Sequence, residues 1–151
     1  MRYHRDWYAK GAISLAVRKR SKREALNDIY YTASLLTCIA RKTNNTVADV
    51  TKAIGEEGVE DIFEYADVNH CLPMDQVARE MISQFRIQNG SVSLPDKDNP
   101  GVSIPSVTKM GKSYALIVAK EETDTEKYPK KLMDILLSKF SSLMEDYDNV
   151  A

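Results

Sequence analysis

The stretch NDIYYTASLLTCIARKT, residues 27–43, decides the fold of this chain. Its apolar side chains recur at helical spacing on two faces. One face holds Ile29, Ala33, Leu36 and Ala40, and the other holds Tyr31, Leu35 and Cys38. A helix that is apolar on more than one face is typical of a buried position among other helices. The stretch therefore predicts a central, buried helix over about residues 28–41.

An amphipathic helix is predicted directly before it, from Trp7 to about Leu26. Asn27 follows, and an asparagine at this point suits the N-cap of the central helix. We therefore expect the boundary between the two helices near Asn27.

A short helix is predicted after the central one, beginning at Thr46 and running through Ile54. Thr46 and Asp49 resemble a capping box, with Asp in the place of the usual Glu or Gln. Gly55 is a natural helix C-cap. A longer helix then begins with glutamates, whose negative charge is favourable at the positive N-terminal end of the helix dipole.

The apolar stripe of that longer helix runs through Val59, Ile62, Phe63, Ala66 and His70. On this spacing His70 lies at the end of the helix, at the edge of the core, bonded to the backbone or to Asp67. Pro73 then begins another helix. Asp67, His70 and Pro73 are thus predicted to form a structural junction between two helices.

The remaining helices follow a Pro- and Gly-containing loop at about residues 88–104, with a short extended piece around Ser91. They are predicted over 105–120 and from Pro129 through Tyr147. The fold class expected is all-α, a compact single-domain bundle of about six or seven helices. Its segments are a basic N-terminal arm at 1–26, a helical core at 27–87 and a C-terminal helical pair at 105–150 packed on that core.

Composition places the chain among ordinary globular proteins. It has 151 residues, of which 43% are hydrophobic and 28% charged. It shows no secretory signal and no apolar run long enough to cross a membrane. Two cysteines cannot form a disulfide framework, so a reducing cytoplasm is the compartment expected.

The chemistry-bearing residues do not form a catalytic or metal-binding pattern. The chain holds two cysteines and two histidines, and the adjacent pair His70 and Cys71 point in different directions on a helix. Gly111-Lys112-Ser113 resembles the end of a phosphate loop, but Ser106 stands where the first glycine belongs. We therefore expect no enzyme activity, no cofactor and no metal. A small hydrolase or transferase using His70 or Cys71 is the third alternative.

Charge is distributed unevenly along the chain. Residues 1–23 carry eight Lys or Arg and one Asp, whereas the remainder carries 13 basic and 21 acidic residues. Five of the cations form a cluster that could contact nucleic acid or a partner: Arg18, Lys19, Arg20, Lys22 and Arg23. Such clusters bind phosphates by releasing counterions. The same cluster could instead dock on the acidic body of the protein.

The last predicted helix is apolar over an unusually wide arc. Burial in the core explains such an arc, and so does a second contact surface for a partner or for another copy of the chain. The residues of that candidate surface are Leu137, Phe140, Met144 and Tyr147.

Three segments carry a resemblance to a known family: NDIYYTASLLTCIARKT (27–43), IGEEGVEDIFEYADVNHCLPMDQVAREMI (54–82) and IPSVTKMGKSYALIV (104–118). They resemble a family of small bacterial and phage-associated helical domains of unknown function, with an A-D-x-x-H pattern at Ala66, Asp67 and His70. The similarity covers about residues 27–147. Some members of that family are encoded beside ADP-ribosyltransferase-like toxins, which implies an antitoxin-like role by analogy.

These observations together favour a non-catalytic interaction protein that neutralises or regulates a protein partner. The alternative is a nucleic-acid-binding accessory protein that uses the basic N-terminal arm.

Overall fold

The computed structural model describes residues 20–92 and 104–138. Within those residues every regular element is a helix and none is a strand, which confirms the predicted all-α class. The elements are α3 (Lys22–Thr43), α4 (Val47–Glu64), α5 (Ala66–Asn69), α6 (Met74–Gln84), α7 (Val107–Glu121), the 3₁₀ turn η1 (Thr125–Lys127) and α8 (Tyr128–Leu136).

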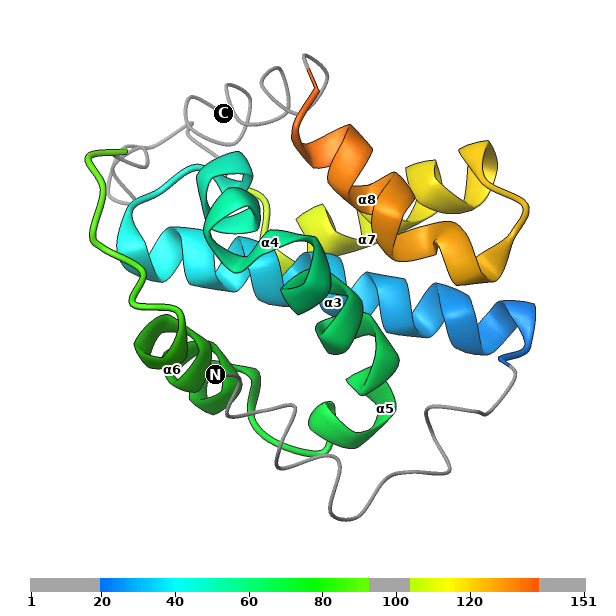
Figure 1. Ribbon diagram of the computed structural model, residues 1–151, viewed down its shortest axis with the longest axis horizontal. Coiled ribbons are helices and arrows are strands. Elements are labelled where there is room, and N and C mark those ends of the chain that lie inside the picture. Colours follow the sequence, from blue (N-terminus) through cyan, green and yellow to red (C-terminus); the bar gives the residue numbers. More distant parts are fainter. Residues whose placement is uncertain (1–19, 93–103, 139–151) are drawn as a thin grey trace.

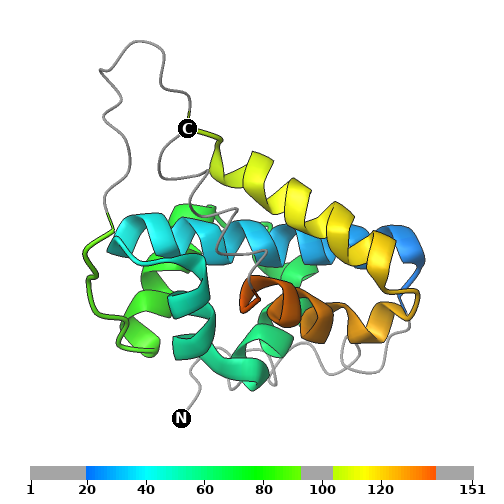
Figure 2. The ribbon, with the colours of Figure 1, turned by 90° about the horizontal axis from the view of Figure 1, so that it is seen from above.

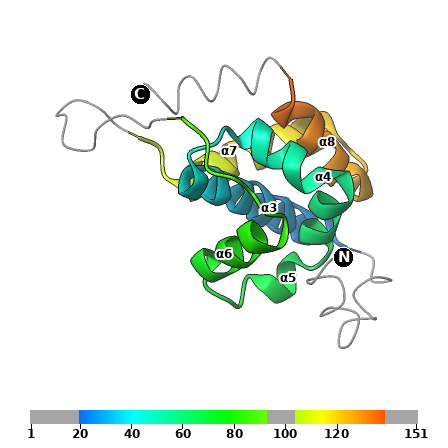
Figure 3. The ribbon, with the colours of Figure 1, turned by 60° about the vertical axis from the view of Figure 1, so that its left-hand side comes forward.

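Helix α3 lies at the centre of the bundle (Figure 1). Helices α5 and α6 lie on one side of it and α7 and α8 on the other, as Figure 3 shows. Helix α7 runs alongside α3 over much of its length (Figure 2), and α4 packs against both α3 and α8. The predicted central, buried helix is therefore confirmed.

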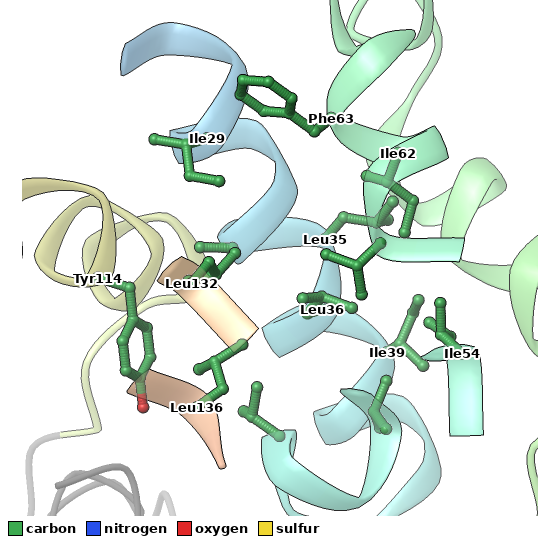
Figure 4. Close-up of a cluster of buried hydrophobic side chains, with 14 of the residues drawn as sticks. Ile29, Leu35, Leu36, Ile39, Ile54, Ile62, Phe63, Tyr114, Leu132 and Leu136 are labelled. Carbon is green, nitrogen blue, oxygen red and sulfur yellow. The ribbon is translucent and has the colours of Figure 1, made fainter. Parts of the chain in front are cut away.

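The hydrophobic core fills the space between α3, α4, α7 and α8 (Figure 4). Leu35, Leu36 and Ile39 of α3 are completely buried, and Tyr114 of α7 and Leu132 of α8 complete the same cluster. Burying one such side chain contributes about 1.5–3 kcal/mol. Helices α7 and α8 thus pack on the core.

The predicted helix boundary near Asn27 is wrong, because α3 runs through this position. Ser21 is the N-cap, and its side chain accepts a hydrogen bond from the Glu24 backbone N–H at 3.1 Å. The Glu24 carboxylate accepts one in return from the Ser21 N–H at 2.9 Å. This capping box starts the helix six residues before Asn27. The rest of the predicted first helix, residues 7–19, lies outside the described residues.

The predicted start and break of α4 are confirmed. The Thr46 hydroxyl accepts a hydrogen bond from the Asp49 backbone N–H at 3.0 Å. Gly55 has φ 80° and ψ 169°, a conformation that glycine adopts without strain, and it bends the element between its two halves. The two helices predicted here therefore join as one kinked helix.

The prediction that His70 continues the apolar stripe of α4 is wrong. Helix α4 ends at Glu64, and Tyr65, with φ −109° and ψ 19°, interrupts the helical path. The one-turn helix α5 that follows buries Ala66 and Asn69 and leaves His70 exposed. Pro73 precedes the first residue of α6, as predicted.

The segment after α6 is anchored to the end of α3. Gly90 N–H donates to the Thr43 carbonyl at 2.7 Å, and Val92 N–H donates to the Asn44 carbonyl at 2.9 Å. Residues 87–92 and 104–106 are not helical, in agreement with the predicted loop, whose middle lies outside the described residues.

The last described helix, α8, ends at Leu136. The helix predicted from Pro129 through Tyr147 is thus shorter in the described chain, and its positions beyond 138 lie outside it. No helix in residues 20–92 or 104–138 is long and apolar enough to cross a bilayer.

Candidate functional site

Arg20, from the basic cluster, is buried and tied to the body of the protein. Its Nε donates to Asp28 Oδ2 at 2.7 Å, and its Nη2 donates to the backbone carbonyls of Phe63 at 3.1 Å and Glu64 at 3.0 Å. Those carbonyls end α4, where a helix leaves its acceptors unpaired and favours a cation. The guanidinium also lies 4.3 Å from the centre of the Phe63 ring. Arg20 therefore caps α4 and joins it to α3.

The guanidinium of Arg20 faces two carboxylates in this network, those of Asp28 and Glu64. Burial lowers the pKa of Arg20, but the hydrogen bond to Asp28 and the charge of Glu64 outweigh it and hold that pKa above its ordinary value. Burial raises the pKa of the Glu64 carboxyl, and the Arg20 charge opposes that rise. Buried ions are tolerated in proteins when they are paired and hydrogen-bonded in this way. We refer to Arg20, Asp28, Phe63 and Glu64 as the arginine network.

The other cations of the cluster differ from Arg20. Lys22 and Arg23 are exposed on the first turn of α3, and Arg18 and Lys19 lie outside the described residues. Of the three described cations of the cluster, Lys22 and Arg23 therefore lie on the surface, and Arg20 is buried in the fold.

A pocket of about 450 Å³ lies between α3, α5, α6 and the start of α7. Tyr30, Tyr31 and Met74 give it apolar walls. Its volume falls within the ~300–1,000 Å³ typical of ligand sites. Of the predicted junction residues, Asp67 and His70 both line it, whereas Pro73 does not appear in its wall.

Two hydroxyl groups of α3 are buried at this pocket without a hydrogen-bond partner in the described part of the chain. They are Tyr31 Oη and Ser34 Oγ. Ser34 is 1% exposed. Burial raises the pKa of the Tyr31 hydroxyl above its ordinary value, and Cys38 adds to the rise. An unpaired buried polar group costs about 1–3 kcal/mol. The described chain provides no hydrogen bond that offsets this cost for the two hydroxyls.

Gly111 accounts for the close approach of α7 behind Ser34. A Cβ at this position would lie closest to the Ser34 Oγ, and also 2.8 Å from the Ser34 backbone nitrogen and 2.9 Å from its Cα. Only glycine lets the two helices cross at this distance. Gly111 of the Gly111-Lys112-Ser113 segment thus has a packing role in helix α7.

His70 and Cys71 do not form a catalytic pair in the structure. The His70 Nδ1 lies 3.3 Å from the Ala66 carbonyl, the backbone contact expected from the sequence. Cys71 is exposed, and its Sγ lies 4.0 Å from the Asp67 carbonyl. Cys38 is half-buried against the core, as expected of a small hydrophobic residue. Across the described ranges, no three His, Cys, Asp or Glu side chains are placed to hold a metal ion.

The predicted partner surface is described only at Leu137, whose side chain is 44% exposed just after α8. Phe140, Met144 and Tyr147 lie outside the described residues. The sequence did not single out Leu116, which is 53% exposed on the outer face of α7.

The sequence also did not indicate the pocket itself. Its wall combines residues of α3 with residues about 35 to 80 positions later in the chain. A signal was present in α3, where Asp28, Tyr31 and Ser34 follow one another at three-residue steps inside an otherwise apolar helix. Polar side chains at that spacing share one face.

Comparison with protein-family models, with curated proteins and with solved structures found no match to this chain. The case for a function therefore depends on the geometry of the described residues.

Proposed function

We propose that this chain is a non-catalytic interaction protein that binds a segment of a protein partner in the pocket between α3, α5 and α6. The observation that carries the proposal is the pocket itself, whose apolar wall includes Tyr31, a residue with a buried hydroxyl that has no hydrogen-bond partner among the described residues. A partner that supplies this bond would remove the cost of leaving the hydroxyl unpaired.

The walls of the pocket support a binding role. Aromatic and methionine side chains provide contact area, and a few polar groups provide orientation, which is the usual composition of a binding site. Tyrosine in particular contributes a large apolar surface together with a polar end.

The proposal is tested by blocking the pocket at its rim. His70→Trp places a large side chain at a position that lines the pocket, and Cys71→Trp places the same side chain at the next position, which does not. Both positions are exposed, so both variants should fold, as circular dichroism would show. Each variant and the wild type would be used to capture partners from the native cell, and the captured protein would then be purified.

The expected result is one partner that binds the wild type and Cys71→Trp with equal Kd and binds His70→Trp at least ~10-fold more weakly. Equal affinity of all three proteins would overturn the proposal, and so would the failure of any protein to bind.

The narrower form of this proposal is an antitoxin-like role, in which the bound partner is a toxic protein that the chain neutralises. Its support is the family resemblance of residues 27–147, and it is tested in the same system. Coexpression with the captured partner should relieve growth arrest, and His70→Trp should relieve it less than Cys71→Trp does.

Nucleic-acid binding through the basic cluster is the less well supported alternative. Of the described cations of the cluster, Arg20 already binds Asp28 and the end of α4, which leaves Lys22 and Arg23 for a phosphate contact. A steep fall of DNA or RNA affinity with salt, removed by Lys22→Gln and Arg23→Gln, would favour this alternative over a protein partner.

A further inference from the structure

Asn89 and Gly90, in the segment that follows α6, form the only Asn-Gly pair in the sequence. Both residues are exposed, and neither lines the pocket to which the proposed function is assigned. We infer that Asn89 is a site of spontaneous deamidation, and that the attachment of Gly90 to the end of α3 sets the rate of this modification. The modification requires no protein partner.

The packing of the chain requires glycine at position 90. A Cβ there would collide with Asn45 Oδ1 and would lie 2.5 Å from the Asn44 carbonyl oxygen. A residue with a side chain therefore does not fit unless this turn moves. The same absence of a Cβ leaves the Gly90 nitrogen unshielded beside the Asn89 side chain. The fold thus keeps after Asn89 the residue type that hinders deamidation least.

The reaction needs only these two residues and water, and it belongs to the chemistry that makes asparagine thermolabile. The Gly90 nitrogen gives up its proton to base and bonds to Asn89 Cγ, while the bond from Cγ to the amide nitrogen breaks and ammonia leaves. The product is a cyclic succinimide. Water then opens the ring at either carbonyl, which gives aspartate or isoaspartate. The net change consumes one water, releases one ammonia and adds a negative charge.

Hydrogen bonds hold the Gly90 nitrogen out of this reaction in the folded chain. The Gly90 N–H donates to the Thr43 carbonyl at 2.7 Å. Asn45 fixes the residue before Asn89, because its Nδ2 donates to the Gln88 carbonyl at 2.8 Å. We refer to these two bonds as the Gly90 anchor, and Figure 1 shows the segment after α6 passing the end of α3. The nitrogen can therefore attack only when the anchor opens locally.

The modification in turn prevents the anchor from forming again. Isoaspartate lengthens the backbone by one carbon between Gln88 and Gly90. The bonds of these two residues to Asn45 and Thr43 both depend on the present spacing. Deamidation therefore follows a transient opening of the anchor and makes that opening permanent.

The test measures the deamidation of each asparagine in the full chain by peptide mapping and mass spectrometry at mildly alkaline pH. In denaturing urea, Asn89 should react faster than Asn44 and Asn69, because the residues after these two, Asn45 and His70, carry a Cβ. In the folded chain, Asn89 should react at least ~10-fold more slowly than in urea, since attack then waits for local opening.

A variant tests whether the anchor causes this protection. Asn45→Ala removes the side-chain bond to the Gln88 carbonyl and should raise the folded-state rate at Asn89 by ~2- to 10-fold, with no change in urea. Hydrogen exchange of the Gly90 amide, followed by NMR, should rise by the same factor. Lys52→Ala, at an exposed position of α4, should change neither rate.

Three results would overturn the inferred site or its control. If Asn89 reacts no faster than Asn44 and Asn69 in urea, Asn89 is not the preferred site. If the wild type reacts at Asn89 equally fast when folded and in urea, the anchor gives no protection, whether or not Asn45→Ala folds. If a folded Asn45→Ala, as checked by circular dichroism, keeps the wild-type rate, the bond to Gln88 does not control the reaction.

Discussion

Helix α3 carries buried polar groups at Asp28, Tyr31 and Ser34, and these groups differ in how they are satisfied. Toward the end of α4, Asp28 meets Arg20, which also bonds the Phe63 and Glu64 carbonyls. Toward the pocket, Tyr31 Oη and Ser34 Oγ have no hydrogen-bond partner in the described chain. The first arrangement holds the fold together. The second leaves hydrogen-bonding capacity unused, as a binding site does before its ligand arrives.

The largest loss of stability expected from this comparison follows a substitution of Arg20. Arg20→Met removes the partner of a buried carboxylate and leaves two carbonyls of α4 without their donor. Breaking a buried ion pair from one side costs about 3–5 kcal/mol. Urea unfolding at neutral pH should show a loss of that size in the free energy of unfolding.

Arg23→Met is the matched control, because Arg23 is exposed on the first turn of the same helix. It should change stability by less than about 0.5 kcal/mol. The double variant Arg20→Met, Asp28→Leu should recover part of the loss, since the buried Asp28 carboxylate that lost the guanidinium is then removed as well. If Arg20→Met unfolds at the same urea concentration as Arg23→Met, the arginine network does not stabilise the fold.

The next largest effect is expected where α7 crosses α3 behind the pocket. Gly111→Ala places a Cβ 2.8 Å from the Ser34 nitrogen, so the helices must separate. Overpacking of this kind costs about 1–3 kcal/mol. Thermal and urea unfolding should show the loss, and Lys112→Ala at the neighbouring exposed position should not.

A second measurement separates the backbone clash from a side-chain clash. Ser34→Gly removes the Oγ that lies nearest to the added Cβ, but the Ser34 nitrogen at 2.8 Å and Cα at 2.9 Å still clash with it, so Ser34→Gly should rescue Gly111→Ala only in part. Full rescue would mean that the Ser34 side chain alone sets the distance between the helices.

The sequence predicts the helices well because each has its own periodic pattern and its own cap. Thr46 caps the start of α4 and Gly55 adopts the positive φ of its kink, as the sequence predicts. The predicted boundary at Asn27 is wrong because the capping box that begins α3 lies at Ser21 and Glu24, within a basic run. These signals act over a few residues, so one sequence is enough to read them.

The pocket could not be predicted in the same way. Ser34, Asp67 and Thr108 lie far apart in the sequence and meet only after α3, α5 and α7 have packed. The position of His70 depends on Tyr65, where the helical path is interrupted and the face presented to α3 changes. Periodicity carries no information about such an interruption when neither Gly nor Pro marks it.

A smaller effect on stability is expected from removing buried hydroxyls of α3, and it should differ between a hydroxyl that is hydrogen-bonded and one that is not. The Thr37 hydroxyl donates to the Ala33 carbonyl at 2.9 Å, whereas the Ser34 hydroxyl has no described partner. Thr37→Val should therefore cost about 1 kcal/mol, and Ser34→Ala should be neutral or slightly stabilising. Urea unfolding of the two variants checks this, and an equal loss for both would mean that Ser34 is bonded in the folded protein.

The smallest effect is expected at His70, where the sequence and the structure disagree. As part of the α4 stripe, His70 would stabilise the core, and His70→Ala would lower the melting temperature. Because His70 is instead exposed at the pocket, His70→Ala should lower the free energy of unfolding by less than about 0.5 kcal/mol. Val59→Ala, within the buried stripe, should cost about 2 kcal/mol and provides the reference. A loss comparable to that of Val59→Ala would restore His70 to the core, whereas unchanged stability with weaker partner binding would assign it to the pocket.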